Sequence, residues 1–219
     1  PLDPDQRSYM EIARTSSEAL LALLNDILDI SRLEAGRLEL QADGFDPVAL
    51  VEGVADLMAP RAHDKGIDIA CFTAAKLPRG LVGDSGRLRQ ILLNLVSNAV
   101  KFTEHGGVTV FLEAAPAGPA ESVLHFAVSD TGIGISDKIR KHLFEAFVQG
   151  DSSHARRHGG SGLGLAIYRQ LVDAMGGTIA VETAPGRGST FRYSVTLPHA
   201  EAIMAAPTAP IHLGGRRVL

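Results

Sequence analysis

The sequence predicts a two-layer α/β fold, in which helices cover one face of a mixed, mostly antiparallel sheet, preceded by one long amphipathic helix. Apolar residues recur at helical spacing through the first 35 residues. From residue 38 to residue 198, helical and strand-like segments are interleaved. The strand pairs 108–115 with 122–130 and 178–183 with 189–198 are each joined by a turn-rich loop, as in antiparallel hairpins. This combination favours an α/β sandwich.

The first element is a helix from Asp5 to about Ala35, ended by Gly36. It contains no Pro or Gly, and its apolar positions are Ile12, Ala19, Leu20, Leu23, Leu24, Ile27, Ile30 and Leu33. At roughly 30 residues the helix would be about 45 Å long, which is more than one small domain covers. We therefore expect its apolar stripe to pack against another helix. The alternative is an ordinary surface helix packed on its own domain.

The elements that follow are predicted from helix caps, apolar alternation and turn residues. Expected strands are 38–42, 67–72, 108–115, 122–130, 178–183 and 189–198, and expected helices are 47–65, 85–103, 137–144 and 162–175. Asp46, Asp84 and Ser136 are the predicted N-caps. The polar, glycine-flanked segment 149–160 is predicted to be a mobile loop, and the Ala/Pro-rich end of the chain a linker.

Composition excludes several classes of protein. With 219 residues, 45% of them hydrophobic, the chain can bury a core, so a disordered chain is excluded. A net charge of −4 without a dense Lys/Arg run argues against nucleic acid or a membrane surface as a partner. No run approaches the ~20 apolar residues of a spanning helix. Cys71 is the single cysteine, so we expect a buried thiol and a cytoplasmic location. Both chain ends suggest a fragment of a longer protein, which could itself be membrane-anchored.

Two asparagines and a lysine share one face of the predicted helix 85–103. Asn94 and Asn98 are four residues apart, and Lys101 follows one turn later. Mg²⁺ prefers hard oxygen ligands, and an ammonium group neutralises phosphate, so this face is a candidate Mg-phosphate site. The alternative is a solvated polar face. It is disfavoured because the same helix carries many apolar residues and should be largely buried, so that its amides need partners.

Asp130 closes a predicted strand and is followed by Thr-Gly-Ile-Gly. A carboxylate at the floor of such a turn can accept a hydrogen bond from an amine, for example the exocyclic amine of adenine. The alternative is an Asp that bonds only its own backbone, which explains the Asp but not the glycines after it.

Gly160, Gly162 and Gly164 open the next helix, where free N–H groups favour a phosphate, although a simple glycine hinge remains the alternative. The segment before them would form a lid over the phosphates, with His154, Arg156, Arg157 and His158. There is no Walker A motif, no dinucleotide fingerprint in the required setting, and no protein-kinase motif set.

In their order along the chain and in their residues, these motifs resemble those of the catalytic ATP-binding domain of sensor histidine kinases. The resemblance covers an N box, a first glycine box, an F box, a second glycine box and a later hairpin: LRQILLNLVSNAVKFT, DTGIGI, FEAFVQ, GGSGLGLAI and GRGSTF. It implies a Bergerat-type α/β sandwich over 38–198 that binds ATP and Mg²⁺. The implied nucleotide-binding residues are Asn94, Asn98, Lys101, Phe102, Asp130, Gly132, Gly134, Ile135, Phe147, Gly160, Ser161, Gly162, Leu163, Gly164, Leu165 and Thr190.

The resemblance also implies roles for individual residues and the identity of the segments on either side of the catalytic domain. Asn98 is the leading metal ligand with Asn94 beside it, and Asn94, Lys101 and Arg156 are the catalytic candidates. Residues 1–37 resemble the second helix of a dimerisation and histidine-phosphotransfer hairpin, which implies a homodimer. Residues 199–219 would be a linker and, at LGGRRVL, the start of a receiver domain on the same polypeptide. None of the eight histidines stands in a phosphoacceptor motif, so the acceptor helix is expected outside this chain.

The function implied is delivery of the γ-phosphate of ATP to that histidine, in two-component phosphorelay signalling. One alternative is an ATP hydrolase of the same superfamily, but Asn94 stands where the resemblance places that class's general base, and an amide cannot take a proton. The other alternative is a pseudokinase that serves as a dimerisation and docking module.

Overall fold

A computed structural model describes residues 3–34, 38–145 and 162–200 of the chain. Its helices are α1 (Pro4–Glu34), α2 (Pro47–Lys65), α3 (Ser85–Phe102), α4 (Asp137–Arg140) and α6 (Gly164–Ala174). Its strands are β1 (Asp43–Phe45), β2 (Asp68–Thr73), β3 (Leu81–Gly83), β4 (Gly107–Pro116), β5 (Glu121–Asp130), β6 (Thr178–Thr183) and β7 (Ser189–Pro198).

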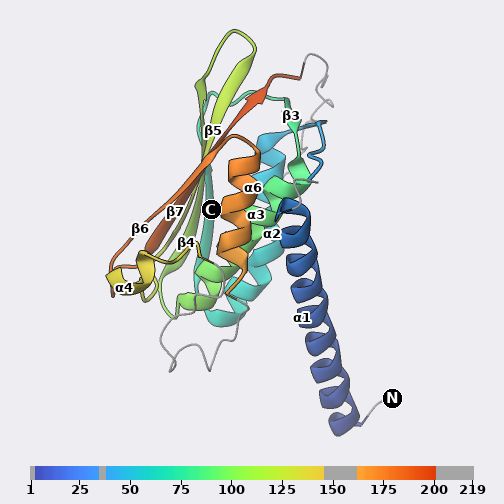
Figure 1. The fold of residues 1–219 in the computed structure, drawn as a ribbon. Coiled ribbons are helices and arrows are strands. Elements are labelled where there is room, and N and C mark those ends of the chain that lie inside the picture. Colours follow the sequence, from blue (N-terminus) through green and yellow to red (C-terminus); the bar gives the residue numbers. More distant parts are fainter. Residues whose placement is uncertain (1–2, 35–37, 146–161, 201–219) are drawn as a thin grey trace, which may run out of the picture.

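Five strands form the main sheet in the order β2-β4-β5-β7-β6. The pair β2–β4 is parallel, and the other three pairs are antiparallel. Helices α2, α3 and α6 lie together on one face of this sheet, and α1 extends away from them (Figure 1). The predicted two-layer fold, with helices on one face of a mostly antiparallel sheet, is therefore confirmed.

The core lies between the sheet and α3. Alternate residues of β4, β5 and β7 are buried, as expected for strands with one covered face. The rings of Phe126 and Tyr193 face each other across β5 and β7 with centroids 4.5 Å apart. The residues that α3 buries are Leu88, Ile91, Leu92, Leu95, Val96, Ala99 and Val100. This pattern leaves Asn94, Asn98 and Lys101 at the half-buried edge of the helix.

The predicted N-caps of the two larger core helices are confirmed. Asp46 accepts hydrogen bonds from the backbone N–H groups of Val48 and Ala49, and Asp84 accepts one from Arg87. The cap predicted at Ser136 forms no side-chain hydrogen bond, and α4 ends at Arg140 rather than near residue 144.

The strand predicted at 38–42 is wrong. Residues 38–42 form no strand, and the strand begins later, at Asp43, where β1 pairs antiparallel with β3. Strand β3 was not predicted at all, because three residues carry too little alternation to be recognised. Pairing between segments some 40 residues apart in the sequence thus decides where β1 lies.

The long helix is confirmed, but its apolar stripe is only partly covered. Near its C-terminal end α1 contacts α6, Leu33 packs against the core and Asp29 is buried. Further toward the N-terminus, Ile12 and Leu24 are 60% and 48% exposed. Within the described ranges, no helix is long and apolar enough to cross a membrane.

Candidate nucleotide-binding site

The end of α3, the turn after β5 and the turn before β7 meet through backbone hydrogen bonds. The N–H of Ile133 donates to the carbonyl of Phe102 at 3.4 Å, and the carbonyl of Ile133 accepts from the N–H of Gly186 at 2.8 Å. Three sequence motifs that lie far apart along the chain therefore form one structural unit, with the turn after Asp130 in the middle.

Asp130 is held in a fixed position between two of these turns. Its Oδ1 accepts hydrogen bonds from the backbone N–H of Gly132 at 2.8 Å and of Ser189 at 3.3 Å. Burial raises the pKa of this carboxyl above its usual value, and the two backbone hydrogen bonds partly oppose that rise. Among the described residues, no hydrogen bond reaches Oδ2, so this oxygen can accept a hydrogen bond from an incoming amine.

Glycines allow the turns to approach this closely. A Cβ at Gly132 would lie 2.4 Å from the carbonyl oxygen of Phe102, and one at Gly188 would lie 1.9 Å from the carbonyl oxygen of Asp130. At Gly134, φ is +66° and a Cβ would lie 1.9 Å from the carbonyl oxygen of Ala184. No other residue fits at these positions without moving a backbone. The glycines of the two turns are thus explained by backbone packing around Asp130.

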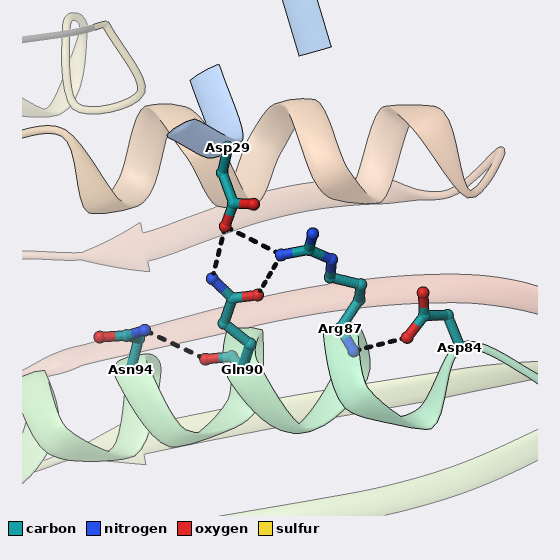
Figure 2. A network of polar contacts seen from close by, with 5 residues as sticks. All are labelled: Asp29, Asp84, Arg87, Gln90 and Asn94. Atoms are coloured by element: carbon teal, nitrogen blue, oxygen red, sulfur yellow. Dashed lines mark hydrogen bonds and ion pairs between the residues drawn. The ribbon is translucent and has the colours of Figure 1, made fainter. Parts of the chain in front are cut away.

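The amide and ammonium groups of α3 lie along one edge of that helix. The Nδ2 of Asn94 donates to the carbonyl of Gln90 at 3.2 Å, an orientation that leaves its carboxamide oxygen as a possible ligand (Figure 2). Asn98, one turn later, is half-buried. Burial lowers the pKa of the Lys101 ammonium, whose Nζ lies 5.1 Å from the centre of the Phe102 ring. These oxygens and this cation suit a hydrated Mg²⁺ ion with phosphate.

Several predicted site residues are placed apart from Asp130 or lie outside the described residues. Thr190 is on the opposite face of the sheet, where its Oγ1 is 2.9 Å from the Oγ of Ser129. Its neighbour Ser189 meets Asp130 instead, a residue that the sequence analysis did not select although it stands in the same motif. The predicted Phe147, Arg156, Gly160 and Ser161, and the predicted lid, lie outside the described ranges.

The start of α6 and the turn at Ile135 carry further residues that the sequence predicted for the site. Helix α6 begins at Gly164, two residues later than predicted, after Gly162 with φ of +70° and a buried Leu163. Leu165 and Ile135 are partly buried and pack against the core. The N–H of Ile135 donates to Thr183 Oγ1 at 2.9 Å.

A polar network that the sequence did not indicate joins α1 to α3 beside Asn94. Asp29 Oδ2 accepts from Arg87 Nη1 at 2.8 Å and from Gln90 Nε2 at 3.0 Å, and Arg87 Nη1 also donates to Gln90 Oε1 (Figure 2). Asp29 is only 5% exposed. No local signal could have found this network, because Asp29 lies 58 and 61 residues from its partners.

Comparison with known proteins identifies the family of this chain. Residues 83–201 match the family described as histidine kinase-, DNA gyrase B-, and HSP90-like ATPase. The chain is 39% identical over 217 residues to the signal transduction histidine-protein kinase BarA of Escherichia coli strain K12, covering 99% of this chain and 24% of BarA. It is 41% identical over 197 residues to the sensor histidine kinase GacS of Pseudomonas protegens, covering 90% of this chain and 22% of GacS.

Among solved structures, full-length ShkA in complex with AMPPNP superimposes with a TM-score of 0.75 at 44% identity, covering 92% of this chain and 41% of ShkA. The chain spans less than a quarter of the length of the two curated relatives. On the match over residues 83–201 and the shared fold, the chain belongs to the family of histidine kinase-, DNA gyrase B- and HSP90-like ATPases.

Proposed function

We propose that this chain is the ATP-binding catalytic part of a sensor histidine kinase, and that it presents the γ-phosphate of Mg-ATP to a histidine outside the chain. The observation that carries the proposal is the geometry of Asp130. One carboxylate oxygen is fixed by Gly132 and Ser189, and the other is open to an adenine amine. The names of BarA and GacS, and the AMPPNP bound to ShkA, support a kinase that uses adenine nucleotides.

The phosphate end of the nucleotide would lie along the polar edge of α3. Asn98 and Asn94 would supply carboxamide oxygens to Mg²⁺, and Lys101 would neutralise a phosphate. Mg²⁺ would supply charge neutralisation on the β- and γ-phosphates. In the transfer step, an N–P bond forms to the acceptor Nε2 while the bond from the γ-phosphorus to the bridging β–γ oxygen breaks and ADP leaves. The chain's contribution to that step is positioning and electrostatic stabilisation, since no side chain bonds to phosphorus.

The proposal distinguishes a kinase from an ATP hydrolase by the residue at position 94. Hydrolysis needs a general base to activate water, and the carboxamide of Asn94 has no basic site for that proton. Its Nδ2 is also engaged by the Gln90 carbonyl. We therefore expect slow phosphate release by the isolated chain; fast release would favour the hydrolase alternative.

We further propose a wider arrangement of the protein. Residues 1–37 would be the second helix of a dimerisation hairpin, 38–198 the catalytic domain, and 199–219 a linker leading to a receiver domain. The exposed apolar residues of α1, among them Ile12 and Leu24, suit a helical bundle with a second chain in a cytoplasmic homodimer. The acceptor histidine would lie on the helix that precedes α1 in such a hairpin.

Calorimetric titration with ATP, with and without Mg²⁺, tests the proposal. We expect binding that Mg²⁺ strengthens, a loss of Mg²⁺ dependence in Asn98→Ala, and a large loss of affinity in Asp130→Asn. Asp173→Asn is a matched control, because Asp173 lies at the far end of α6 in an exposed pair with Arg169. Absence of binding in the parent chain under both conditions would favour the pseudokinase alternative.

A further inference from the structure

Lys65, the last residue of α2, reaches across to the end of α3. Its Nζ donates hydrogen bonds to the carbonyl oxygens of Val100 at 2.8 Å, Lys101 at 2.9 Å and Thr103 at 3.0 Å. An ammonium group has three N–H donors, so all three are used on backbone acceptors of one helix end. Helix α2 then stops at Gly66, whose left-handed conformation turns the chain toward β2.

Two of the acceptors of Lys65, the carbonyls of Val100 and Lys101, belong to the last turn of α3, and the third belongs to the C-cap residue Thr103. The last four carbonyls of an α-helix lack intrahelical donors and carry the negative end of the helix dipole. A cation held on them stabilises the last turn against fraying. Lys65, which belongs to α2, therefore stabilises the C-terminal end of α3.

The turn that Lys65 stabilises carries two candidate nucleotide-binding side chains. Lys101 and Phe102 belong to it, and Asn98 lies just before it. The carbonyl of Phe102 also accepts from the N–H of Ile133, in the turn that fixes Asp130. If the last turn of α3 frayed, Lys101 and Phe102 would shift relative to Asp130, and the turn after β5 would lose a backbone partner.

We propose that Lys65 is a positioning residue for the nucleotide site, acting through the backbone of α3 without touching the nucleotide. This inference rests on the proposed function, since it concerns how the same site is held. It gives the two lysines different tasks. In the proposed function Lys101 neutralises a phosphate, whereas Lys65 fixes the backbone that bears Lys101.

Calorimetric titration with Mg-ATP, combined with amide hydrogen exchange, tests the role of Lys65. In Lys65→Met we expect about tenfold weaker Mg-ATP binding, equivalent to about 1.4 kcal/mol. Faster exchange should be confined to the end of α3 and the turn after Asp130. Lys65→Arg keeps a cation near the carbonyls and should recover most of the affinity, although its planar donors cannot converge on three acceptors.

Lys76→Met is the matched control, because Lys76 is an exposed lysine in the loop between β2 and β3. It removes the same charge and should leave affinity unchanged. Three results would overturn the inference: unchanged affinity in Lys65→Met, equal losses in Lys65→Met and Lys65→Arg, or faster exchange throughout the core, which would mark a merely structural role. A parent chain that binds no ATP would overturn the proposed function as well, which separates that failure from a failure of Lys65 alone.

Discussion

Removing the Asp29 carboxylate should release α1 from the catalytic domain. Asp29 is 5% exposed and accepts two hydrogen bonds from α3, one of them in an ion pair with Arg87 at 2.8 Å. The side chains of this pair are 20% exposed at Arg87 and 7% exposed at Asp29, so solvent screens the interaction weakly. The substitution Asp29→Ala removes the carboxylate oxygen that accepts these two hydrogen bonds from Arg87 and Gln90.

The size of the effect follows from these contacts. A hydrogen bond to a charged group contributes roughly 2 kcal/mol and the second bond, from the Gln90 amide, about 1 kcal/mol. The larger penalty of breaking a fully buried pair, about 3–5 kcal/mol, is not expected in full, because Arg87 can rehydrate. We therefore expect a docking penalty of about 3 kcal/mol, or a factor of roughly 10² in the equilibrium between docked and undocked α1.

Amide hydrogen exchange and limited proteolysis measure this equilibrium directly. In Asp29→Ala, exchange should rise in the C-terminal half of α1 and in the first turns of α3, while the strands of the main sheet keep their protection. A double-mutant cycle with Arg87→Ala should give a coupling free energy above about 1.5 kcal/mol. Asp173→Ala is the control, because its ion pair with Arg169 is long, at 3.9 Å, and more than half exposed. Equal exchange in Asp29→Ala and the control would refute this reasoning.

Three further predictions concern the site and the core. Asp130→Asn should weaken ATP binding at least tenfold. It should not lower the unfolding midpoint at neutral pH, because the raised pKa of Asp130 means that folding disfavours its ionised carboxylate. In the parent chain, this destabilisation should diminish as the pH falls through the pKa of Asp130 in the folded state. A lower unfolding midpoint in Asp130→Asn at neutral pH would contradict the raised pKa of Asp130. Gly134→Ala should abolish ATP binding, since its Cβ would lie 1.9 Å from the Ala184 oxygen. Gly186→Ala, also at positive φ but with open space around it, should cost only about 1 kcal/mol in chemical denaturation. Tyr193→Phe should raise the free energy of unfolding by about 1 kcal/mol, because among the described side chains the buried Tyr193 hydroxyl has no hydrogen-bond partner. Burial raises the pKa of Tyr193, so the parent should also lose stability above about pH 10, where the unfolded tyrosine ionises, and Tyr193→Phe should lack that loss.

Local pattern was enough to predict most elements of the fold. The long helix α1, the caps Asp46 and Asp84, and both hairpins follow from periodicity, capping residues and turns, which act over a few residues. The short strands were not predictable in this way. Strand β1 was placed too early and β3 was missed, because a three-residue strand is defined by its partner rather than by its own alternation.

The candidate site shows the same division. The sequence alone marked the motifs around Asn98, Lys101 and Asp130, since glycine-rich turns and polar residues on a buried helix are local signals. Only the tertiary structure brings the end of α3 to the turn after Asp130, and only there does Ser189, rather than Thr190, meet that carboxylate.

The contacts of Asp29 and Lys65 depend entirely on the tertiary structure. Each joins α3 to another helix across 35 or more residues of sequence. Neither side chain stands in a motif, because its partner is chosen by how helices pack and not by neighbours along the chain. Local sequence pattern specifies the longer helices and strands and the chemical groups that they carry. The packing of helices and strands decides which of those groups face one another, because groups far apart in the sequence meet only when the core closes.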